Sequence, residues 1–402
     1  MNWPTVKLSE VAQVNPKLPK DTNEAQEVTF LPMAAISEGG EILEQEKRVL
    51  STTKKGFTYF EKNDVIVAKI TPCFENGKAA FLSGLDTQIG FGSTEFHVIR
   101  VNLEKLDPSY LFYLIWNKEF RHKGERNMTG SAGQKRVPAD FLKSLKIPLP
   151  PLEEQKRISG LLYKADLIKN KRQKAIQLAD SFLRSTFLDM FGDPYTNSKN
   201  WEVKSISKCL LDGEIEGIQD GNHGNDHPKV EDFVTKGTPF VAANVVRNGK
   251  ILFDKCYYLD SSWLDKLRIG FAKPRDVLLS HKGTLGLTAV LDDSYDTYIF
   301  SPQTTYYRLN ESKLLPEYLK AYFDTAFFQR LLEKEGKQST RAYIGITRQK
   351  DLPVMIPSID FQNKFLKVIE VASSIKEYSS DSKHRNCELF DSISQKALAG
   401  SL

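Results

Sequence analysis

The sequence predicts an α+β protein: two mixed α/β units in a pseudo-twofold repeat, separated by two long helices that form an antiparallel coiled coil. Short apolar runs typical of strands recur in the same order in both halves of the chain. Each half then ends in a long stretch with apolar residues at helical spacing, entered through Ile-Pro at 147–148 and at 356–357. The expected boundaries are 1–148 for the first unit, 149–192 for the first helix, 193–357 for the second unit and 358–402 for the second helix.

Five matched segments support the internal repeat. Trp3 matches Trp201. After an extra segment at 217–228 in the second half, the offset between matched residues stays near 208–212. Five matches in one order at a nearly constant offset indicate a duplication. The other matched pairs are 28–43 with 237–252, 64–72 with 276–284, 91–100 with 300–309, and 107–114 with 315–322.

The first long stretch has apolar residues at alternating spacings of three and four over residues 162–190, with a polar middle at Lys169 and Arg172. It ends at residues 191–194, Phe-Gly-Asp-Pro, a glycine stop followed by proline. The second stretch begins near Asp360 and also has a polar centre. Two such helices can pack on each other, and antiparallel packing is favoured because each follows its own unit. Two unrelated exposed helices are the alternative. The apolar positions of the second stretch are Phe365, Val368, Ala372, Ile375, Leu389, Ile393 and Ala397.

The bulk composition is that of a globular protein with more than one core. The chain has 402 residues, of which 40% are hydrophobic and 11% aromatic, and its net charge of +5 is compatible with a polyanionic partner without requiring one. The four cysteines stand far apart with no CxxC pair, which favours a reducing compartment. Neither a secretory signal nor an apolar run of membrane-spanning length is visible. We therefore expect a cytoplasmic protein with no membrane contact.

Motifs for catalysis are missing. Residues 335–340 contain Gly-Lys but lack the other positions of a phosphate-binding loop. Residues 193–195, Asp-Pro-Tyr, lack the second proline of an adenine methyltransferase motif and are interpreted as a helix cap. Asp64 and Lys69 could form part of a nuclease metal site, but the matching strand at 276–282 supplies no second acid for a divalent metal. His223 and His227 lie in a Gly/Asn-rich segment with no further ligands at zinc spacing, so no metal site is expected.

The arrangement resembles the specificity subunit of Type I restriction-modification systems, over essentially the whole chain. The most specific signal is IPLPPLEEQ at 147–155, which opens the first long helix; its second copy, at 356–362, lacks the double proline and the acidic pair, so we expect a different entry angle there. The other segments that carry the resemblance are 191–194, 220–223, 237–251 and 276–283.

This resemblance implies a non-catalytic DNA-binding subunit of a prokaryotic phage-defence system. Two target recognition domains would each recognise one half of a split DNA sequence, and the helices would fix the gap and dock methyltransferase subunits. Those subunits would methylate adenine with S-adenosylmethionine, and separate restriction subunits would cut, while this chain would bind no cofactor. A helix of about 40 residues is roughly 60 Å long, enough to hold two domains at least one DNA turn, about 34–36 Å, apart.

Candidate DNA contacts are basic and polar residues in matching loops. The segment 126–136 combines cations, glycines and amide or hydroxyl groups. The segment 337–348 contains the same residue types and an added tyrosine. A solvated surface loop is the alternative. The basic stretch 169–174 either faces phosphates or is a solvated helix face, and a protein-interaction scaffold remains the alternative function. The full set is Lys69, Lys78, Arg126, Ser131, Gln134, Lys135, Arg136, Asn222, His223, Lys282, Lys337, Arg341, Tyr343 and Arg348.

Overall fold

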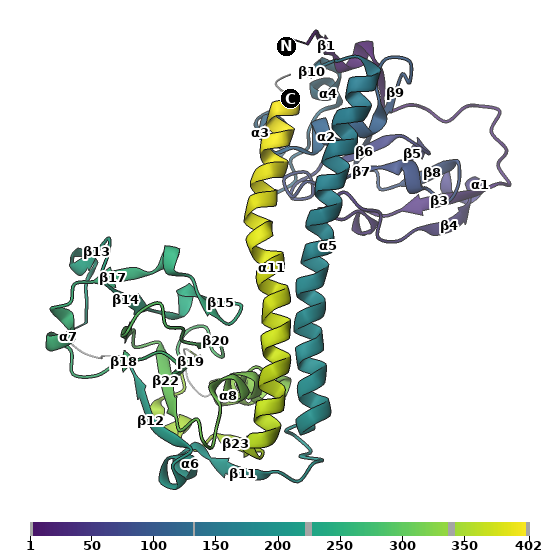
Figure 1. Cartoon of the computed structure of the whole chain (residues 1–402). Helices are drawn as coiled ribbons and strands as arrows, with labels where there is room; N and C mark the ends of the chain where they lie inside the picture. The colour runs from purple at the N-terminus through teal and green to yellow at the C-terminus, as the bar shows by residue number, and fades with distance from the viewer. Residues whose placement is uncertain (1–2, 132, 222–226, 337–341, 399–402) are drawn as a thin grey trace. The chain divides into compact units, whose positions relative to one another are not determined.

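The protein is described by a computed structural model that covers residues 3–131, 133–221, 227–336 and 342–398 (Figure 1). The chain divides into two compact units. The first comprises Met1–Gln173 with Ser380–Leu402, and the second comprises Lys174–Ser379. Each of the two long helices is therefore shared between the units.

The first unit contains two four-stranded sheets and a two-stranded ribbon. The sheets have strand orders β2-β9-β6-β7 and β4-β3-β8-β5, and β1 pairs with β10. All pairs are antiparallel except β3 with β8. The elements are β1 Thr5–Lys7, β2 Ala12–Val14, β3 Glu27–Leu31, β4 Glu46–Val49, α1 Leu50–Thr53, β5 Thr58–Glu61, β6 Val65–Ala68, β7 Ala79–Phe81, β8 Ile89–Gly92, β9 Phe96–Val101, α2 Pro108–Trp116, α3 Lys118–Arg126, α4 Ala139–Ser144, β10 Lys146–Pro148 and the long helix α5 Leu152–Phe191, with 3-10 turns at Leu8–Glu10, Met33–Ala35 and Leu82–Gly84.

The second unit repeats this plan. The order β12-β22-β19-β20 corresponds to β2-β9-β6-β7, and the ribbon β11-β23 corresponds to β1-β10; a five-stranded sheet, β13-β17-β14-β21-β18, and the hairpin β15-β16 complete it. Its elements are β11 Glu202–Ser205, α6 Ile206–Asp212, β12 Ile215–Asp220, β13 Phe233–Val234, β14 Thr238–Val241, β15 Val246–Arg247, β16 Lys250–Ile251, β17 Tyr257–Leu259, α7 Trp263–Lys266, β18 Phe271–Ala272, β19 Val277–Ser280, β20 Thr288–Val290, β21 Tyr298–Phe300, β22 Thr304–Leu309, α8 Pro316–Phe323, α9 Ala326–Gly336, α10 Ile346–Gln349, β23 Pro353–Ile356 and the long helix α11 Ile359–Leu398, with 3-10 turns at Val230–Asp232, Ala243–Val245 and Phe253–Lys255.

Strand β6 shows why the first unit forms layers. Its four residues are all buried, and because side chains alternate along a strand they enter two different cores. Val65 and Val67 pack in a cluster with residues of α2, whereas Ile66 and Ala68 pack in a cluster that includes Phe60 of the other sheet. A continuous apolar run is therefore required here, covered by helix on one face and by sheet on the other.

The structure corrects the sequence match over residues 91–100. Val65 of β6 lies opposite Ile99, and Val277 of β19 lies opposite Tyr307. The segment 91–100 therefore matches 299–308 and not 300–309, a shift of one residue. With this correction Arg100 corresponds to Arg308. An alternating strand pattern has a period of two, so side-chain type alone does not fix such a register.

The apolar pattern of the first long helix is confirmed. Each of the predicted positions 162, 165, 169, 172, 176, 179, 183, 186 and 190 is buried or half-buried. The helix ends where the sequence predicts: Gly192 has φ +81°, and its N–H donates to the carbonyl of Leu188 at 2.9 Å. Glycine adopts this left-handed conformation without a Cβ clash and so closes the helix.

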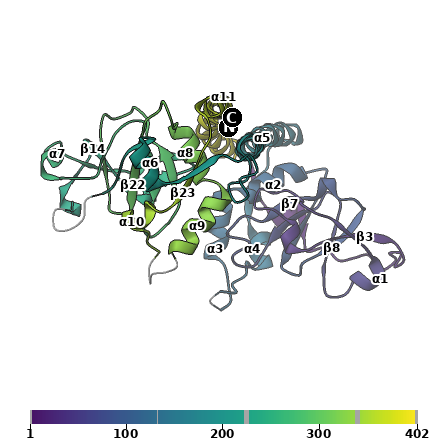
Figure 2. The same ribbon diagram turned by 90° about the horizontal axis from the view of Figure 1, so that it is seen from below.

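Inside the second unit the two long helices run antiparallel. The rings of Phe187 on α5 and Phe365 on α11 lie 5.7 Å apart between centroids, and Asp180 forms an ion pair with Lys376. A step toward the N-terminus of α5 thus corresponds to a step toward the C-terminus of α11. Figure 2 shows these helices nearly end-on. Ile375, expected in the apolar seam, is instead 46% exposed. Three further expected seam positions, Leu389, Ile393 and Ala397, lie outside the described side chains.

A buried glutamine joins α5 to the first unit. Gln155 is fully buried, and its side-chain oxygen accepts a hydrogen bond from the N–H of Asp107 at 2.8 Å. Its amide nitrogen donates to the carbonyls of Lys105, at 3.0 Å, and Pro150, at 2.8 Å. One side chain thereby satisfies three main-chain groups, two in the segment before α2 and one in the entry to α5.

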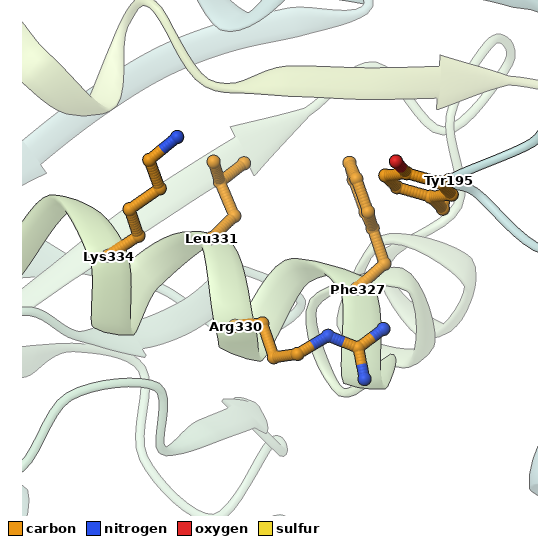
Figure 3. A pocket seen from close by; sticks show the side chains of 5 residues that line it. All are labelled: Tyr195, Phe327, Arg330, Leu331 and Lys334. Atoms are coloured by element: carbon orange, nitrogen blue, oxygen red, sulfur yellow. The ribbon is translucent and has the colours of Figure 1, made fainter.

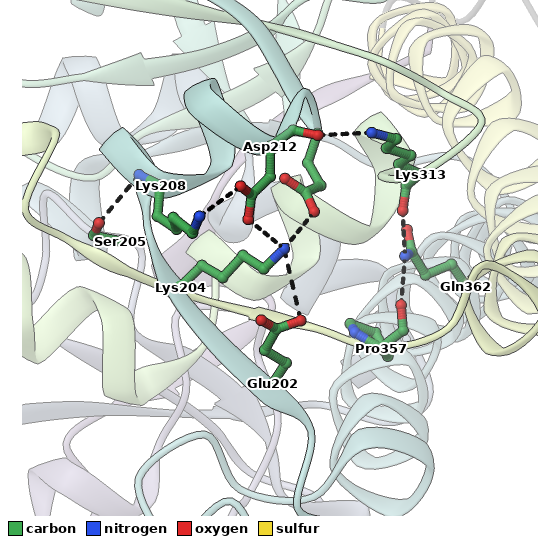
Figure 4. A network of polar contacts seen from close by, with 9 residues as sticks. Glu202, Lys204, Ser205, Lys208, Asp212, Lys313, Pro357 and Gln362 are labelled. Atoms are coloured by element: carbon green, nitrogen blue, oxygen red, sulfur yellow. Dashed lines mark hydrogen bonds and ion pairs between the residues drawn. The ribbon is translucent and has the colours of Figure 1, made fainter.

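The second unit has the same joint. Gln362, also fully buried, accepts from the N–H of Leu315 at 2.8 Å and donates to the carbonyls of Lys313, at 3.1 Å, and Pro357, at 2.9 Å. Figure 4 shows the two donated bonds beside the ion pairs of Lys204 with its acidic neighbours. The missing prolines of the second entry therefore leave the joint itself unchanged.

We expect the substitution Gln155→Met to lower the free energy of unfolding by about 3 kcal/mol, because it keeps the side-chain length but leaves one buried and two partly buried main-chain groups without partners. Urea and thermal unfolding followed by circular dichroism would measure the loss. The matched control is Gln177→Met on the exposed face of the same helix, expected to change stability by less than about 0.5 kcal/mol. Equal effects at the two positions would contradict this role.

Candidate nucleic-acid interface

Five of the predicted residues lie in or beside one hairpin of the first unit. The segment 127–137 lies along the connection that follows β6: the N–H of Thr71 donates to the carbonyl of Lys135 at 3.0 Å, and the N–H of Val137 donates to the carbonyl of Lys69 at 2.8 Å. A turn closes the tip, where the N–H of Gln134 donates to the carbonyl of Ser131 at 3.1 Å. Main-chain bonds thus bring together Lys69, Ser131, Gln134, Lys135 and Arg136.

The hairpin presents polar side chains to solvent. Ser131, Gln134 and Lys135 are exposed, and Gly130 and Gly133 have φ of +121° and +84°. Such backbone angles allow the tight turn that glycine permits and a side chain does not. A hydroxyl, an amide and an ammonium are therefore exposed close together on the hairpin frame, which is the segment 127–137 with the connection to which it bonds.

Arg136 is held in place by an acid. Its Nε lies 3.0 Å from Oε2 of Glu95, and its Nη2 lies 2.9 Å from Oε1. This bidentate hydrogen bond lowers the pKa of the Glu95 carboxyl. The Arg136 side chain remains 41% exposed, so the guanidinium is both oriented and accessible.

A buried histidine supports the base of the hairpin. His97 of β9 is 5% exposed, and its Nε2 donates to the carbonyl of Val137 at 2.8 Å while its Nδ1 accepts from Asn15 at 3.1 Å. Burial lowers the pKa of His97, which fits the neutral form that these two bonds require. Sequence reasoning missed Glu95, His97 and Asn15; a histidine inside an apolar strand run was the available signal.

The second unit has an equivalent frame. Lys282 and Tyr343 form a β-bridge, and the N–H of Ile344 donates to the carbonyl of His281 at 3.0 Å, as Val137 does to Lys69. The Lys282 ammonium lies 5.9 Å from the centroid of the Tyr343 ring. The ring is 41% exposed and the lysine is exposed. The recurrence of the frame is confirmed, with different side chains at matching positions.

The remaining predicted residues do not lie together in the hairpin. Lys78 is half-buried and donates to the carbonyl of Met33 at 3.1 Å. Arg126 is exposed on the last residue of α3. Arg348 is exposed but forms an ion pair with Glu335 at 2.7 Å. Four more predicted residues lie outside the described part of the chain: Asn222, His223, Lys337 and Arg341.

Part of the basic stretch 169–174 contacts other side chains of the first unit. The Lys169 ammonium lies 5.4 Å from the centroid of the Trp116 ring and 3.6 Å from the Asp166 carboxylate. Lys171 and Lys174 are exposed. Contacts to the chain itself thus account for part of this stretch, and phosphate contact by the exposed lysines stays a prediction.

Asp64 has a structural partner in place of a metal. Its two carboxylate oxygens accept from Nε and Nη2 of Arg100 at 2.9 and 2.7 Å. The matching Asp276 accepts from Arg308 at 3.0 and 2.7 Å. Both acids are 2% exposed, so each arginine neutralises a buried charge at the start of a core strand.

Within the described residues, no group of three or more His, Cys, Asp or Glu side chains could hold a metal ion. Cys73, Cys209 and Cys256 are free thiols. In that same part of the chain, no helix has the length and apolarity needed to span a membrane.

The repeated units and their matching polar hairpins define a duplicated fold built on long helices. A family model described as the Type I restriction modification DNA specificity domain matches residues 1–178. The specificity subunit of the Type I restriction enzyme EcoEI from Escherichia coli is 44% identical over 274 residues, which cover 62% of this chain and 45% of that subunit. The chain thus spans about half the length of this curated relative.

Two solved structures share the fold. The S subunit of a Type I restriction-modification system from M. genitalium aligns with a TM-score of 0.65 at 12% identity, covering 99% of this chain and 96% of that one. A chain from a study of complex assembly and conformational transition of the type I R-M system aligns with a TM-score of 0.52 at 19% identity, covering 100% and 98%. Residues 1–178 match the model of the Type I DNA specificity domain, and the chain is similar to Type I specificity subunits. The resemblance seen in the sequence is confirmed.

The ion pair between Glu95 and Arg136 gives a pH-dependent prediction. Because Arg136 lowers the pKa of Glu95, the pair stabilises the fold at neutral pH, and this contribution is lost as the pH falls below about 4. We expect Glu95→Gln to lower the melting temperature at pH 7 and the difference from wild type to shrink in acid. Glu104→Gln, at an exposed carboxylate, is the control; a difference independent of pH would refute the assignment.

Proposed function

We propose that this chain is the non-catalytic DNA-binding subunit of a Type I restriction-modification complex. It recognises a bipartite DNA sequence and directs methyltransferase and restriction subunits to that site. The observation that carries the proposal is the hairpin frame found beside β6 and again beside β19, because two equivalent frames suit the two halves of a split target. The family match of residues 1–178 supports DNA as the ligand.

The chemistry of the first hairpin suits duplex DNA. Lys135 supplies a mobile charge for phosphate, whereas Gln134 and the oriented guanidinium of Arg136 supply donors in fixed geometry for base edges. Tyr343 at the position that matches Arg136 gives the second unit an aromatic surface and a hydroxyl. The two units therefore recognise different half-sites.

The partners follow from the proposed family role. Methyltransferase subunits dock on the long helices and carry S-adenosylmethionine, so this chain needs no cofactor of its own. Restriction subunits join in the full complex, which works in the prokaryotic cytoplasm as a phage defence. The relative described as part of the type I R-M system, in a study of complex assembly, supports this assignment.

Methylome sequencing tests the proposal directly. Cells with the chain and its methyltransferase partner should carry methylated adenine in one split motif, with unspecified bases between the halves. Exchanging residues 1–148 for the first unit of a related subunit should change one half-site only, and an insertion within residues 152–190 should change only the spacing. A continuous motif, or methylation that persists without the chain, would contradict the proposal.

Single substitutions in the hairpin should separate phosphate contact from base contact. We expect Lys135→Ala to weaken binding of the complex to all duplexes and to reduce the slope of log K against log salt by about 1. Gln134→Ala should cost about 1–3 kcal/mol on the cognate sequence and little elsewhere.

The control for both variants is Lys143→Ala, because the Lys143 ammonium pairs with Asp140 at 3.0 Å. It should leave affinity and slope unchanged. A duplicated protein-interaction scaffold, the other candidate, would show no steep salt dependence on DNA at all, so fluorescence anisotropy over a salt series distinguishes the two functions.

A further inference from the structure

Helix α9 of the second unit carries an open hollow of ≈ 390 Å³, lined by Tyr195, Phe327, Arg330, Leu331 and Lys334. In Figure 3, Phe327, Leu331 and Lys334 rise from one side of the helix, Tyr195 lies next to Phe327, and Arg330 leaves the helix on an adjoining side. Phe327 and Leu331 pack inward against the core, while Tyr195 is 77% exposed. The hollow therefore combines an apolar floor with two cations at its edge.

The internal repeat shows what the fold itself requires at this place. The side chain of Asn117 accepts a hydrogen bond from the N–H of Phe120 at the start of α3, and that of Thr325 accepts one from Phe328 at the start of α9. Phe120 and Phe328 are both buried. These equivalent bonds align α3 with α9 residue by residue.

In this alignment, Phe327 and Leu331 take the places of Glu119 and Lys123. In the first unit these two residues form an exposed ion pair at 2.7 Å, with side chains that are 70% and 60% exposed. The core beneath the helix is thus complete with charged residues at both positions. The apolar pair of the second unit therefore has no counterpart in the first, whose core forms without one.

The cations of the hollow are available. Arg330 and Lys334 are exposed and form no ion pair within the described residues, whereas Glu335, next along α9, is engaged by Arg348 at 2.7 Å. Two uncompensated cations beside apolar side chains attract a ligand that is itself both apolar and acidic.

The geometry argues against a nucleobase or a bare phosphate. The rings of Tyr195 and Phe327 lie 6.4 Å apart and are inclined by 57°, so they form no parallel slot for a planar base. Phosphate needs donors and gains nothing from the apolar side chains that form most of the floor. A side chain such as Leu or Phe, flanked by carboxylates, satisfies both parts of the surface.

We propose that this hollow, the α9 site, docks an acidic amphipathic segment of a partner protein. An apolar anchor enters between Tyr195, Phe327 and Leu331, and carboxylates pair with Arg330 and Lys334. Because α3 has an ion pair where α9 has the apolar pair, the partner binds once per chain. This inference goes beyond the proposed function and does not depend on which DNA the chain recognises.

The test uses the full chain and a fluorescent helical peptide with Leu and Phe anchors four residues apart and Asp or Glu at the flanking positions. Fluorescence anisotropy should show saturable binding. Exchanging the acids for lysines, or the anchors for serine, should weaken it at least about tenfold. Equal binding of all three peptides, or of none, would overturn the proposal.

The internal repeat supplies the decisive variant. The double substitution Phe327→Glu with Leu331→Lys installs the ion pair of the first unit, so the fold is kept, as circular dichroism and thermal unfolding would verify. It should abolish peptide binding, and Arg330→Glu with Lys334→Glu should remove the preference for acids. Leu211→Ser, at an apolar residue that is 82% exposed elsewhere in the second unit, should change neither.

The same variants exclude other occupants. If the Phe327→Glu, Leu331→Lys chain bound peptide normally but lost affinity for duplex DNA, the α9 site would be a DNA contact and the proposal wrong. If sedimentation showed that this variant loses a concentration-dependent self-association of the wild type, the occupant would be a second copy of the chain, again against the proposal.

Discussion

Each unit depends on one buried glutamine for its attachment to a long helix. Gln155 and Gln362 reach main-chain groups that no secondary structure satisfies, on both sides of the joint at once. An unmet main-chain group in a buried place is costly, so the helix cannot swing away from its unit without breaking several bonds together. The glutamine therefore helps to hold each long helix at a set angle to its own unit.

The second constraint is electrostatic and is also present twice. Asp64 and Asp276 begin the central strands of their sheets with a buried carboxylate, and Arg100 and Arg308 neutralise it from the neighbouring strand. A charge buried in this way is tolerated only with a bonded partner. The pair fixes the register of the two strands, and the hairpin frames are built on the far ends of these same strands.

Much of this architecture could be predicted from the sequence because it follows from periodicity. The seam of α5, the stop at Gly192 and the order of the repeated strands are properties of residues near one another in the chain. Contacts between distant residues could not be predicted in this way. The bond from Arg136 to Glu95 joins positions 41 residues apart, and nothing in either local pattern distinguishes it from a free surface charge.

The α9 site was hidden for a related reason. Phe327 and Leu331 have the spacing of an ordinary core face, and only the comparison with α3 separates them from the residues that the core needs. The one-residue error over 91–100 arose because positions 91 and 300 are both phenylalanine, whereas the strand register matches position 91 with 299. The spacing of Ile375 predicted a place in the seam. A periodic pattern, however, does not predict which of its positions a partner helix covers.

The hairpin frames have a consequence for how such a protein changes over time. The bonds that position the frames run between main-chain groups, from Thr71 to Lys135 in one unit and from Gly283 to Ala342 in the other. Side chains at the tips therefore contribute little to folding, and mutation can replace them without a stability penalty. The tip sequence of each half can change independently of the other half. One duplicated scaffold can therefore generate many pairs of specificities by recombination of halves.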